Sequence, residues 1–336
     1  MTTEPSILTI VLNYRTPEMT LKAVAAALRE MEGLRGEIAL IENGSADNSV
    51  EVLSHAIADN GWGDRVRLIT SDHNGGFGAG CNIGIRAGMA DGGRPDFVYL
   101  LNSDAFPQPG AIRGLRDFLM ANPRAGMVGS FVRGTDGEPH RTAFRFPSIA
   151  GEFEMSARTG VISRLLHRSI VAIPIPEAET RIDWVAGASL MMRQDMLDAI
   201  GGFDETFFLY FEETDLCHRA ARAGWQTHYL PSSEVLHIGS ASTGMKGWTR
   251  TPRYWFDSRS HYFSKTHGRA YAALATLARV GGLLVWKLRR LISDKPQADP
   301  DRFLGDLVAH SLATPFRRRP NTREVQFPRI VLEDKQ

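Results

Sequence analysis

The chain has 336 residues, which suggests one large domain with appendages or two smaller domains. Its hydrophobic fraction of 43% and charged fraction of 23% are ordinary for a globular protein and exclude disorder over most of the length. The 39 Lys and Arg residues nearly cancel the 38 Asp and Glu residues, so the net charge of +1 indicates no partner by itself. Cys81 and Cys217 are the only cysteines, which excludes a disulfide framework and a cysteine zinc site and favours a reducing compartment. Because Met1–Ser6 has neither a basic nor an apolar region, no secretory signal is expected.

The first hundred and thirty residues alternate between short apolar runs and stretches with helix signals. Four apolar runs predict buried strands: Ile7–Leu12, Glu37–Ile41, Val66–Ile69 and Phe97–Leu101. Helices are predicted between them, the first from Pro17 to about Met31 and the second ending near Ala58. This alternation predicts an α/β fold with parallel strands and right-handed crossovers, in which ligands bind beyond the carboxyl ends of the strands. Polar clusters follow the four predicted strands: Asn13-Tyr14, Glu42-Asn43, Asp72–Gly80 and Asn102–Asp104.

The second half of the chain is less regular. Its predicted elements are a strand at Trp184–Met192, a short helix to Ile200, a helix at Glu212–Ala223 and a strand at Trp225–Leu230. No element is predicted for Arg141–Pro176. We divide the chain into a catalytic domain (1–240), a basic and aromatic helical extension (241–293) and a loosely held polar tail (294–336).

A carboxylate and an amide follow the fourth predicted strand, at Asp104 and Asn102. Oxygen donors of this kind can hold a hard divalent cation together with phosphate oxygens, although a turn alone explains the same residues. His237 lies in an apolar run, and this setting by itself is typical of a histidine in the hydrophobic core. It becomes a metal ligand only if the fold brings it to Asp104.

The stretch Asn74–Gly84 is dense in glycine and opens a predicted helix, whose amides attract anions. It does not match GxGxxG and follows the third predicted strand, and no Walker A motif occurs in the chain, so a dinucleotide dehydrogenase is poorly supported. A flexible loop explains the glycines equally well.

Three carboxylates, Glu212, Glu213 and Asp215, occupy the first turn of a predicted helix. The free amides and dipole of a helix N-terminus favour anions, so we expect these groups to be ionised at neutral pH. An ionised carboxylate beside a pocket can act as general base toward a sugar hydroxyl. The general preference for acids in a first helical turn accounts for one or two of them.

Taken in order, these motifs resemble the family 2 glycosyltransferases of GT-A fold, most closely the bacterial rhamnosyltransferase-like group. The matching pieces between Ile7 and Lys265 are Val11–Arg15, Ile41–Ser45, Asn74–Gly84, Leu101–Asp104, Trp184–Ala188, Gly202–Glu205 with Phe211–Leu216, and His237 followed by Gly239 and Ser240. Each piece is short, but seven in the same order make a chance match improbable.

The resemblance implies a nucleotide-diphosphate sugar as donor and a divalent metal, Mg²⁺ or Mn²⁺, as cofactor. It implies that Asp104 and His237 bind the metal, with Asn102 where many members have a first Asp, and that Glu213 is the general base of an inverting single displacement. Glu212 and Asp215 are the reserve candidates for the base. The residues that it implies for donor binding are Asn13, Tyr14 and Glu42 at the nucleobase, Asn74, Gly76 and Asn82 in the glycine-rich stretch, and Asn102, Trp184 and Gly187.

The resemblance favours rhamnose carried by deoxythymidine diphosphate as the donor sugar, followed by the uridine-diphosphate hexoses, and a lipid-linked or polysaccharide acceptor. Two alternatives stay open: a sugar-nucleotide pyrophosphorylase, and a non-catalytic protein that binds a nucleotide sugar or serves as a membrane scaffold. The pyrophosphorylase predicts a basic glycine-rich loop after the first strand, and Asn13–Pro17 is not such a loop.

The segment 245–292 has ten basic residues and one acid, Asp257, and therefore a net charge of +9. Its apolar part, Ala270–Trp286, would span only about 25 Å as a helix, too short to cross a bilayer. Two interpretations are equally supported: an amphipathic helix on an anionic membrane surface, and a helix packed on the catalytic domain. Because no nucleic-acid-binding module surrounds these residues, we expect no nucleic acid partner. The expected location is the cytoplasm, peripheral on the inner face of the cell membrane.

Overall fold

The computed structural model describes residues 4–239, 248–297 and 299–313 of the chain. Its strands are β1 (Ile7–Asn13), β2 (Gly36–Glu42), β3 (Val66–Thr70), β4 (Phe97–Asn102), β5 (Ala105–Pro107), β6 (Ala125–Arg133), β7 (Pro139–His140), β8 (Ala143–Phe144), β9 (Thr180–Ile182), β10 (Trp184–Val185), β11 (Ser189–Arg193) and β12 (Gln226–His237). Its helices are α1 (Pro17–Glu30), α2 (Ser49–Asp59), α3 (Phe77–Ala87), α4 (Ala111–Ala121), α5 (Ile149–Ala157), α6 (Gly160–Leu165), α7 (Gln194–Ile200), α8 (Glu212–Arg222), α9 (Arg253–His267), α10 (Arg269–Leu291) and α11 (Phe303–Ala313), with a 3-10 turn at His167–Ser169.

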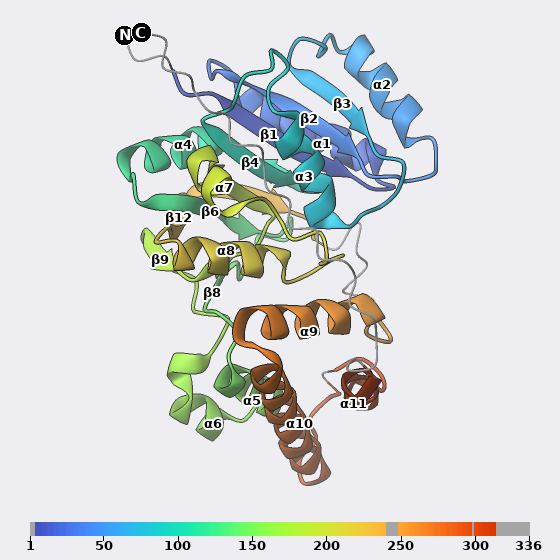
Figure 1. Cartoon of the computed structure of the whole chain (residues 1–336), viewed down its shortest axis with the longest axis vertical. Coiled ribbons are helices and arrows are strands. Elements are labelled where there is room, and N and C mark those ends of the chain that lie inside the picture. The colour runs from blue at the N-terminus through green and yellow to red at the C-terminus, as the bar shows by residue number, and fades with distance from the viewer. Residues whose placement is uncertain (1–3, 240–247, 298, 314–336) are drawn as a thin grey trace.

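One large mixed sheet runs through the upper part of the molecule in the order β3-β2-β1-β4-β11-β6-β12-β5 (Figure 1). The strands β3, β2, β1 and β4 are mutually parallel, as the alternation of strands and helices predicts. The second half is mixed, because β11 lies antiparallel between β4 and β6. The predicted α/β architecture, a mixed sheet flanked by helices, is therefore confirmed.

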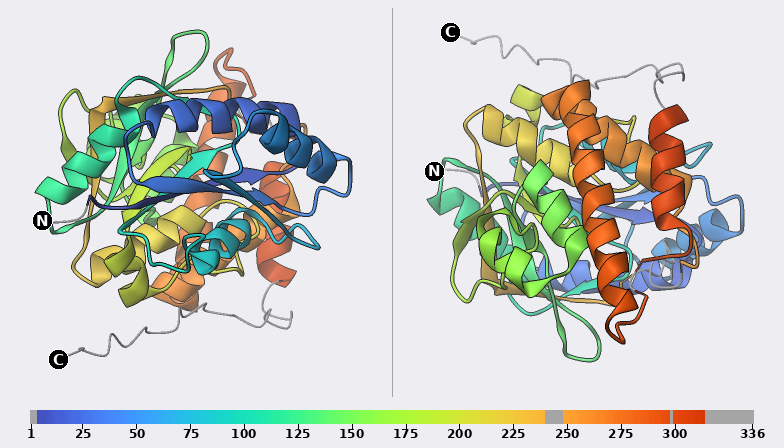
Figure 2. Two further views of the ribbon diagram at one scale, coloured as in Figure 1. Left: turned by 90° about the horizontal axis from the view of Figure 1, so that it is seen from above. Right: turned by 90° about the horizontal axis from the view of Figure 1, so that it is seen from below.

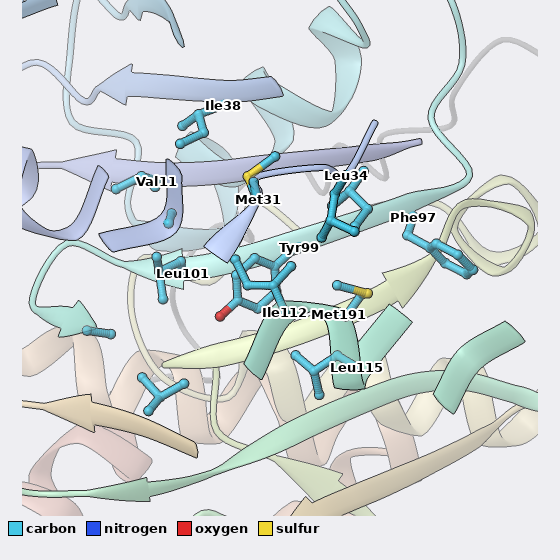
Figure 3. Close-up of a cluster of buried hydrophobic side chains, with 14 of the residues drawn as sticks. Val11, Met31, Leu34, Ile38, Phe97, Tyr99, Leu101, Ile112, Leu115 and Met191 are labelled. Carbon is cyan, nitrogen blue, oxygen red and sulfur yellow. The ribbon is translucent and has the colours of Figure 1, made fainter. Parts of the chain in front are cut away.

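Helices cover both faces of this sheet, which explains why its first strands are apolar without interruption. On one face, α1, α2 and α4 pack through a core that includes Met31, Tyr99, Ile112 and Met191 (Figure 3). On the other face, α3, α7 and α8 form a second core with Cys81 and Cys217, both of which are buried free thiols. Burial of large apolar side chains on both sides fixes the direction and register of the strands that carry the polar clusters.

Two strands differ from the expected bounds. The predicted strand Trp184–Met192 is wrong as a single element, since β10 pairs with β8 in a small separate sheet and β11 lies in the main sheet. The last strand, β12, runs seven residues past Leu230, where the predicted strand ended, because its pairing with β6 continues after an irregularity between Leu230 and Glu234. Beyond this irregularity, His237 lies opposite Ala105 of β5.

The helices α5, α6, α9, α10 and α11 form a helical unit at the end of the molecule farthest from the first strands (Figure 1). This unit includes α5 and α6 from the segment Arg141–Pro176, where no element was predicted. Part of the tail expected to be loosely held forms α11, and Phe303 and Leu307 of this helix are buried against the rest of the unit. Residues 314–336 lie outside the described residues.

The longest helix of the unit, α10, has 23 residues, whereas the sequence predicted a shorter apolar stretch. Within the described part of the chain, it is the one helix whose length and composition would let it cross a membrane. One side of α10 packs closely on α5, since a Cβ on Gly282 would lie 2.5 Å from the Phe153 carbonyl oxygen.

A buried ion cluster holds α5, α9 and α10 together. Arg259 donates two hydrogen bonds of 3.0 and 2.7 Å to Glu152 Oε2, and Arg279 donates a third of 3.2 Å. All three side chains are buried. Burial alone raises the pKa of Glu152, but the two guanidinium groups outweigh it and lower that pKa below its ordinary value. Two of the ten cations in the basic segment are therefore internal.

We predict that Glu152→Gln destabilises the protein strongly, because it leaves two buried guanidinium groups without an ionic partner. The expected loss in the free energy of unfolding is about 3–5 kcal/mol, measured by chemical denaturation. An exposed partner serves as control: Asp195→Asn, which breaks the surface pair with Arg94, should cost less than about 1 kcal/mol. Because the pKa of Glu152 is lowered in the folded state, the difference between wild type and variant should be present at neutral pH and disappear under acid conditions. Equal stability of the two variants at pH 7 contradicts this account.

Candidate active site

The carboxyl ends of β1, β2 and β4 meet at one edge of the sheet, and the predicted polar residues gather there. The sheet register places Asn13 beside Glu42 and Leu12 beside Asn102. Asn102 in turn donates its backbone N–H to the Ala188 carbonyl oxygen at 3.1 Å. Residues far apart in the sequence thus share one edge, as expected for ligand binding in a parallel sheet.

The first two strand ends form a tight polar turn. Glu42 is buried, and its carboxylate accepts hydrogen bonds from the backbone N–H groups of Ser45 at 2.8 Å and Gly44 at 3.2 Å. Asn13 is also buried, accepting from Thr20 at 2.8 Å and lying 3.4 Å from Ser45 Oγ. Tyr14 follows on the partly exposed side. In this structure Glu42 and Asn13 shape the turn, and contact with a nucleobase stays a prediction for all three residues.

The glycine-rich stretch forms the start of α3 and a link to the loop before α8. Asn74 Oδ1 accepts from Gly76 N–H at 2.9 Å and from Asn43 at 3.0 Å. Phe77 N–H donates to the Phe208 carbonyl oxygen at 3.0 Å. Gly76 has φ of 93°, and a Cβ there would collide with the Phe208 backbone, so glycine is required. The loop is therefore built into the site, and the flexible-loop interpretation is wrong for this segment.

Asn82 has a structural position on α3. Its side chain is fully buried, donates to the Phe203 carbonyl oxygen at 2.9 Å and accepts from the Phe203 N–H at 2.9 Å. A further hydrogen bond of 3.0 Å joins it to Glu205. These bonds fix the loop after α7 onto α3, and they use both ends of the Asn82 amide.

The extension of β12 brings His237 to Asp104. His237 Nε2 lies 2.9 Å from Asp104 Oδ1 and 3.4 Å from the Asn102 amide nitrogen. Asp104 is 5% exposed, and its backbone carbonyl accepts from Ile238 N–H at 3.1 Å. A carboxylate, an imidazole and an amide thus lie close together. The fold therefore brings His237 to Asp104, which was the condition for interpreting His237 as a metal ligand.

A second histidine, His140 of β7, packs against this cluster. Its ring lies edge-on to the His237 ring, with the centroids 6.1 Å apart. No sequence motif points to His140, because it stands alone between a glycine-containing turn and an arginine. Only the pairing of β7 with the end of β6 places it beside His237.

The break between β10 and β11 makes room for Glu213. Gly187 N–H donates to Glu213 Oε1 at 3.2 Å, and a Cβ on Gly187 would lie 2.5 Å from that oxygen. Trp184 flanks the break, with its ring stacked on Phe144 and its Nε1–H donating to the Arg145 carbonyl oxygen at 2.9 Å. Because Ala188 is bonded to Asn102, the Glu213 carboxylate is anchored next to the strand end that precedes Asp104.

Glu212 and Glu213 do not behave as ordinary helix-start acids. Glu212 is 1% exposed, and its Oε2 atom has no hydrogen-bond partner among the described residues. Burial, and then the charge of Glu213, raise the pKa of Glu212 well above its ordinary value. Burial also raises the pKa of Glu213. Both shifts oppose the expectation that these two acids are ionised at neutral pH, because desolvation acts against the helix dipole, and the pKa of Glu212 is raised further than that of Glu213.

The third acid of the group, Asp215, has a structural role. It is buried and accepts hydrogen bonds from Arg219 at 2.8 Å and from Lys265 of α9 at 3.0 Å. Lys265 also donates a hydrogen bond of 2.8 Å to Asp204. The same Asp204 carboxylate accepts a hydrogen bond of 2.9 Å from His261. Burial raises the pKa of Asp204, but these donors outweigh it and hold that pKa far below its ordinary range. The sequence did not single out this network, which ties α9 to the start of the α8 helix.

We predict that Gly76→Ala destabilises the protein by more than about 1 kcal/mol, because the new Cβ meets the Phe208 backbone at a positive φ. Gly114→Ala is the matched control: Gly114 lies inside α4, where a Cβ makes only ordinary contact, so this variant should be neutral or stabilised by up to about 1 kcal/mol. Both values come from equilibrium denaturation. A Gly76→Ala protein as stable as the Gly114→Ala protein contradicts the described loop geometry.

The sequence of this chain is similar to those of known proteins. Residues 5–263 match the family described as "Glycosyltransferase like family 2". An N-acetylglucosaminyl-diphospho-decaprenol L-rhamnosyltransferase of Mycobacterium tuberculosis is 29% identical over 252 residues, which cover 65% of this chain and 78% of the relative. Rhamnosyltransferase WbbL of Escherichia coli is 25% identical over 165 residues, 48% of this chain and 60% of the relative.

Solved structures share the fold at low sequence identity. Mannosyltransferase PcManGT of Pyrobaculum calidifontis, in complex with GDP-Man and Mn²⁺, superposes with a TM-score of 0.55 and 14% identity, covering 94% of this chain and 82% of that chain. GalNAc-T7 with UDP, GalNAc and Mn²⁺ gives a TM-score of 0.55 at 12% identity, covering 96% and 60%. These are GT-A glycosyltransferases, so the predicted GT-A fold is confirmed. With a family match over most of its length, this chain belongs to glycosyltransferase family 2 and is a glycosyltransferase.

Proposed function

We propose that this enzyme transfers a sugar, with inversion, from a nucleotide-diphosphate donor to a hydroxyl group of a lipid-linked or polysaccharide acceptor. The observation that carries the proposal is the placement of the Asp104–His237 pair and the Glu213 carboxylate at one edge of the sheet. The Asp104–His237 pair is suited to bind a cation together with a diphosphate, and the Glu213 carboxylate is suited to remove a proton from an acceptor hydroxyl.

Rhamnose is the favoured donor sugar, because two bacterial relatives carry the name rhamnosyltransferase. Deoxythymidine-diphosphate rhamnose is therefore the first donor to test, and the uridine-diphosphate hexoses are the next. The name of the mycobacterial relative includes a diphospho-decaprenol, which supports a lipid-linked acceptor over a free polysaccharide. Such an acceptor places the enzyme in the cytoplasm, at the inner face of the membrane.

The residues present fit a divalent cation. Asp104 and His237 would hold it, and one carboxylate with one imidazole suits Mn²⁺ or a Mg²⁺ ion that takes its other ligands from water and phosphate. When bound, the cation supplies positive charge that neutralises the diphosphate leaving group. Asn102, which lacks the charge of a carboxylate, adds a neutral amide beside this pair.

The chain's own residues divide the remaining work. Glu213 accepts the proton of the acceptor hydroxyl, and the Gly187 N–H keeps one of its oxygens at a fixed position. Glu212, buried behind the glycine-rich loop, keeps its own proton and leaves Glu213 as the ionised member of the pair. Asp215 is excluded as the base, because Arg219 and Lys265 hold it inside the protein. The acceptor oxygen then attacks the anomeric carbon from the face opposite the diphosphate, so the configuration inverts without a covalent enzyme intermediate.

We predict that Asp104→Asn and Glu213→Gln each lower kcat/KM by about 10²–10⁴-fold while the melting temperature stays close to that of wild type. Activity is followed as nucleoside diphosphate release over a panel of donors, with and without Mg²⁺ or Mn²⁺. Glu18→Gln, an exposed acid on α1, is the control and should keep full activity. Full turnover in both site variants contradicts the catalytic proposal.

We also predict an acid limb in the pH dependence of kcat/KM with an apparent pKa above 4.5. Glu213 must be ionised to accept a proton, and its raised pKa means that activity is present at high pH and is lost as the pH falls. Glu212→Gln mimics the protonated neighbour, so it should keep activity within about tenfold at pH 7 and leave the limb where it is in wild type. A limb that Glu212→Gln moves to lower pH would show that Glu212 is charged while Glu213 titrates, which contradicts the proposed roles of the pair.

A further inference from the structure

Apolar side chains gather on the surface of the helical unit. Fourteen large hydrophobic side chains are exposed in the described part of the chain, and eleven of them lie on α5, α6, α10 or α11, or directly after α10. These four helices lie side by side when the molecule is viewed from that end (Figure 2). Solvent-exposed apolar residues that cluster in this way mark an interaction surface.

The longest part of this surface is a stripe on α10. Leu274, Leu277, Leu284, Leu288 and Leu291 follow one another at intervals of three, seven, four and three residues, so they share one face of the helix. Their exposed fractions run from 48% to 81%. The other face of α10 packs on α5 through residues that include Gly282 and Trp286. One helix thus has an internal face and a second apolar face that no described residue covers.

The charges around the stripe are mostly basic. In the described residues of 149–170 and 269–313, which include α11, seven exposed cations outnumber two exposed acids. The cations are Arg164, Arg168, Arg269, Lys287, Arg290, Lys295 and Arg302, and the acids are Asp294 and Asp301. Glu152 and Glu154 are buried. An apolar stripe with a basic border complements a surface that is apolar inside and anionic at its rim, which is the property of a bilayer with acidic headgroups.

We propose that the α6–α10–α11 face of the helical unit is a docking surface for an anionic lipid bilayer, with the α10 leucine stripe lying in the membrane interface. This deepens the membrane location suggested by the proposed lipid-linked acceptor, but it rests on the surface and not on turnover. A second copy of the chain fits less well, because its basic border would meet an identical basic border. The lipid-facing cations come from α6 and the second half of α10, whereas Arg259, Arg279 and Lys265 of the basic segment are used inside the protein.

The helix lies on the bilayer and does not cross it. Arg279, in the middle of α10, is bound to Glu152 of α5, and one whole face of α10 packs on that helix. Crossing would break this buried ion cluster and place a guanidinium group in hydrocarbon, where a charge is costly. Washing membranes at high salt and alkaline pH should therefore release the full-length protein.

The test is flotation of the full-length protein with vesicles of phosphatidylglycerol and phosphatidylethanolamine, compared with vesicles of phosphatidylcholine alone. We expect binding to the anionic vesicles that weakens as salt rises. Leu277→Glu with Leu288→Glu should lower the partition coefficient at least about tenfold, since two apolar contacts are lost. Arg164→Glu with Lys287→Glu should lower it roughly 25-fold or more, at about fivefold for each charge removed.

Matched controls change the same residue classes elsewhere. Val50→Glu with Met120→Glu replaces exposed apolar residues on α2 and α4, and Lys22→Glu with Arg124→Glu reverses exposed charges near the sheet. Both should float like wild type, and so should Asp104→Asn, which separates this proposal from the catalytic one. Equal flotation of the leucine variant and wild type, or no binding of wild type to anionic vesicles, overturns the proposal. So does a wild-type dimer in sedimentation velocity that the leucine variant loses, because the stripe would then be a contact between copies.

Discussion

The candidate site depends on the hydrogen-bonded ladder between β6 and β12, because this ladder determines where His237 lies. The first part of β12 completes the mixed sheet, and the strand continues past the irregularity after Leu230. Beyond the irregularity the same strand pairs with β5, directly after Asp104. The ladder thus stabilises the sheet and also brings together a carboxylate and an imidazole that lie 133 residues apart in the sequence. Changes that shift its register would separate these groups without touching either one.

A second set of contacts links the sheet edge with the candidate site to the helical unit. Lys265 of α9 reaches both Asp204 and Asp215, so it joins the loop before α8 to the helix that carries Glu212 and Glu213. The residues just before that helix, Tyr210 and Phe211, have φ values of 69° and 70°, which bulky side chains rarely adopt. A loop held in this conformation requires support from its surroundings. The α9 contacts supply that support, so the helical unit belongs to the structure of the site as well as to its periphery.

The sequence predicted the N-terminal half of the fold well, because four strands with apolar residues on both faces alternate with helices that have clear start signals. It also predicted that the polar strand ends would share one edge, which follows from parallel topology. The residue pattern alone could not predict the meeting of His237 and Asp104, which only the family resemblance implied, since the predicted strand ended at Leu230 and the irregularity in the β6–β12 pairing begins there. It misjudged Glu212, because a helix-start acid looks the same whether it faces water or is buried. The location of α5 was hidden because its apolar face packs on α10, more than one hundred residues later in the sequence, and α6 has no buried residue to indicate where it lies.

This last feature bears on the order in which the protein can fold during synthesis. The buried ion cluster around Glu152 can form only after Arg259 and Arg279 have been synthesised, long after α5 has left the ribosome. At a synthesis rate of about 5–20 residues per second, several seconds pass between the synthesis of α5 and the synthesis of its ionic partners and packing surface. The parallel sheet can form in that interval from segments that are already present. We therefore expect a nascent chain in which the parallel half of the sheet has formed while α8 still lacks its contacts with α9, so that the candidate site is completed only after the last helices have been synthesised.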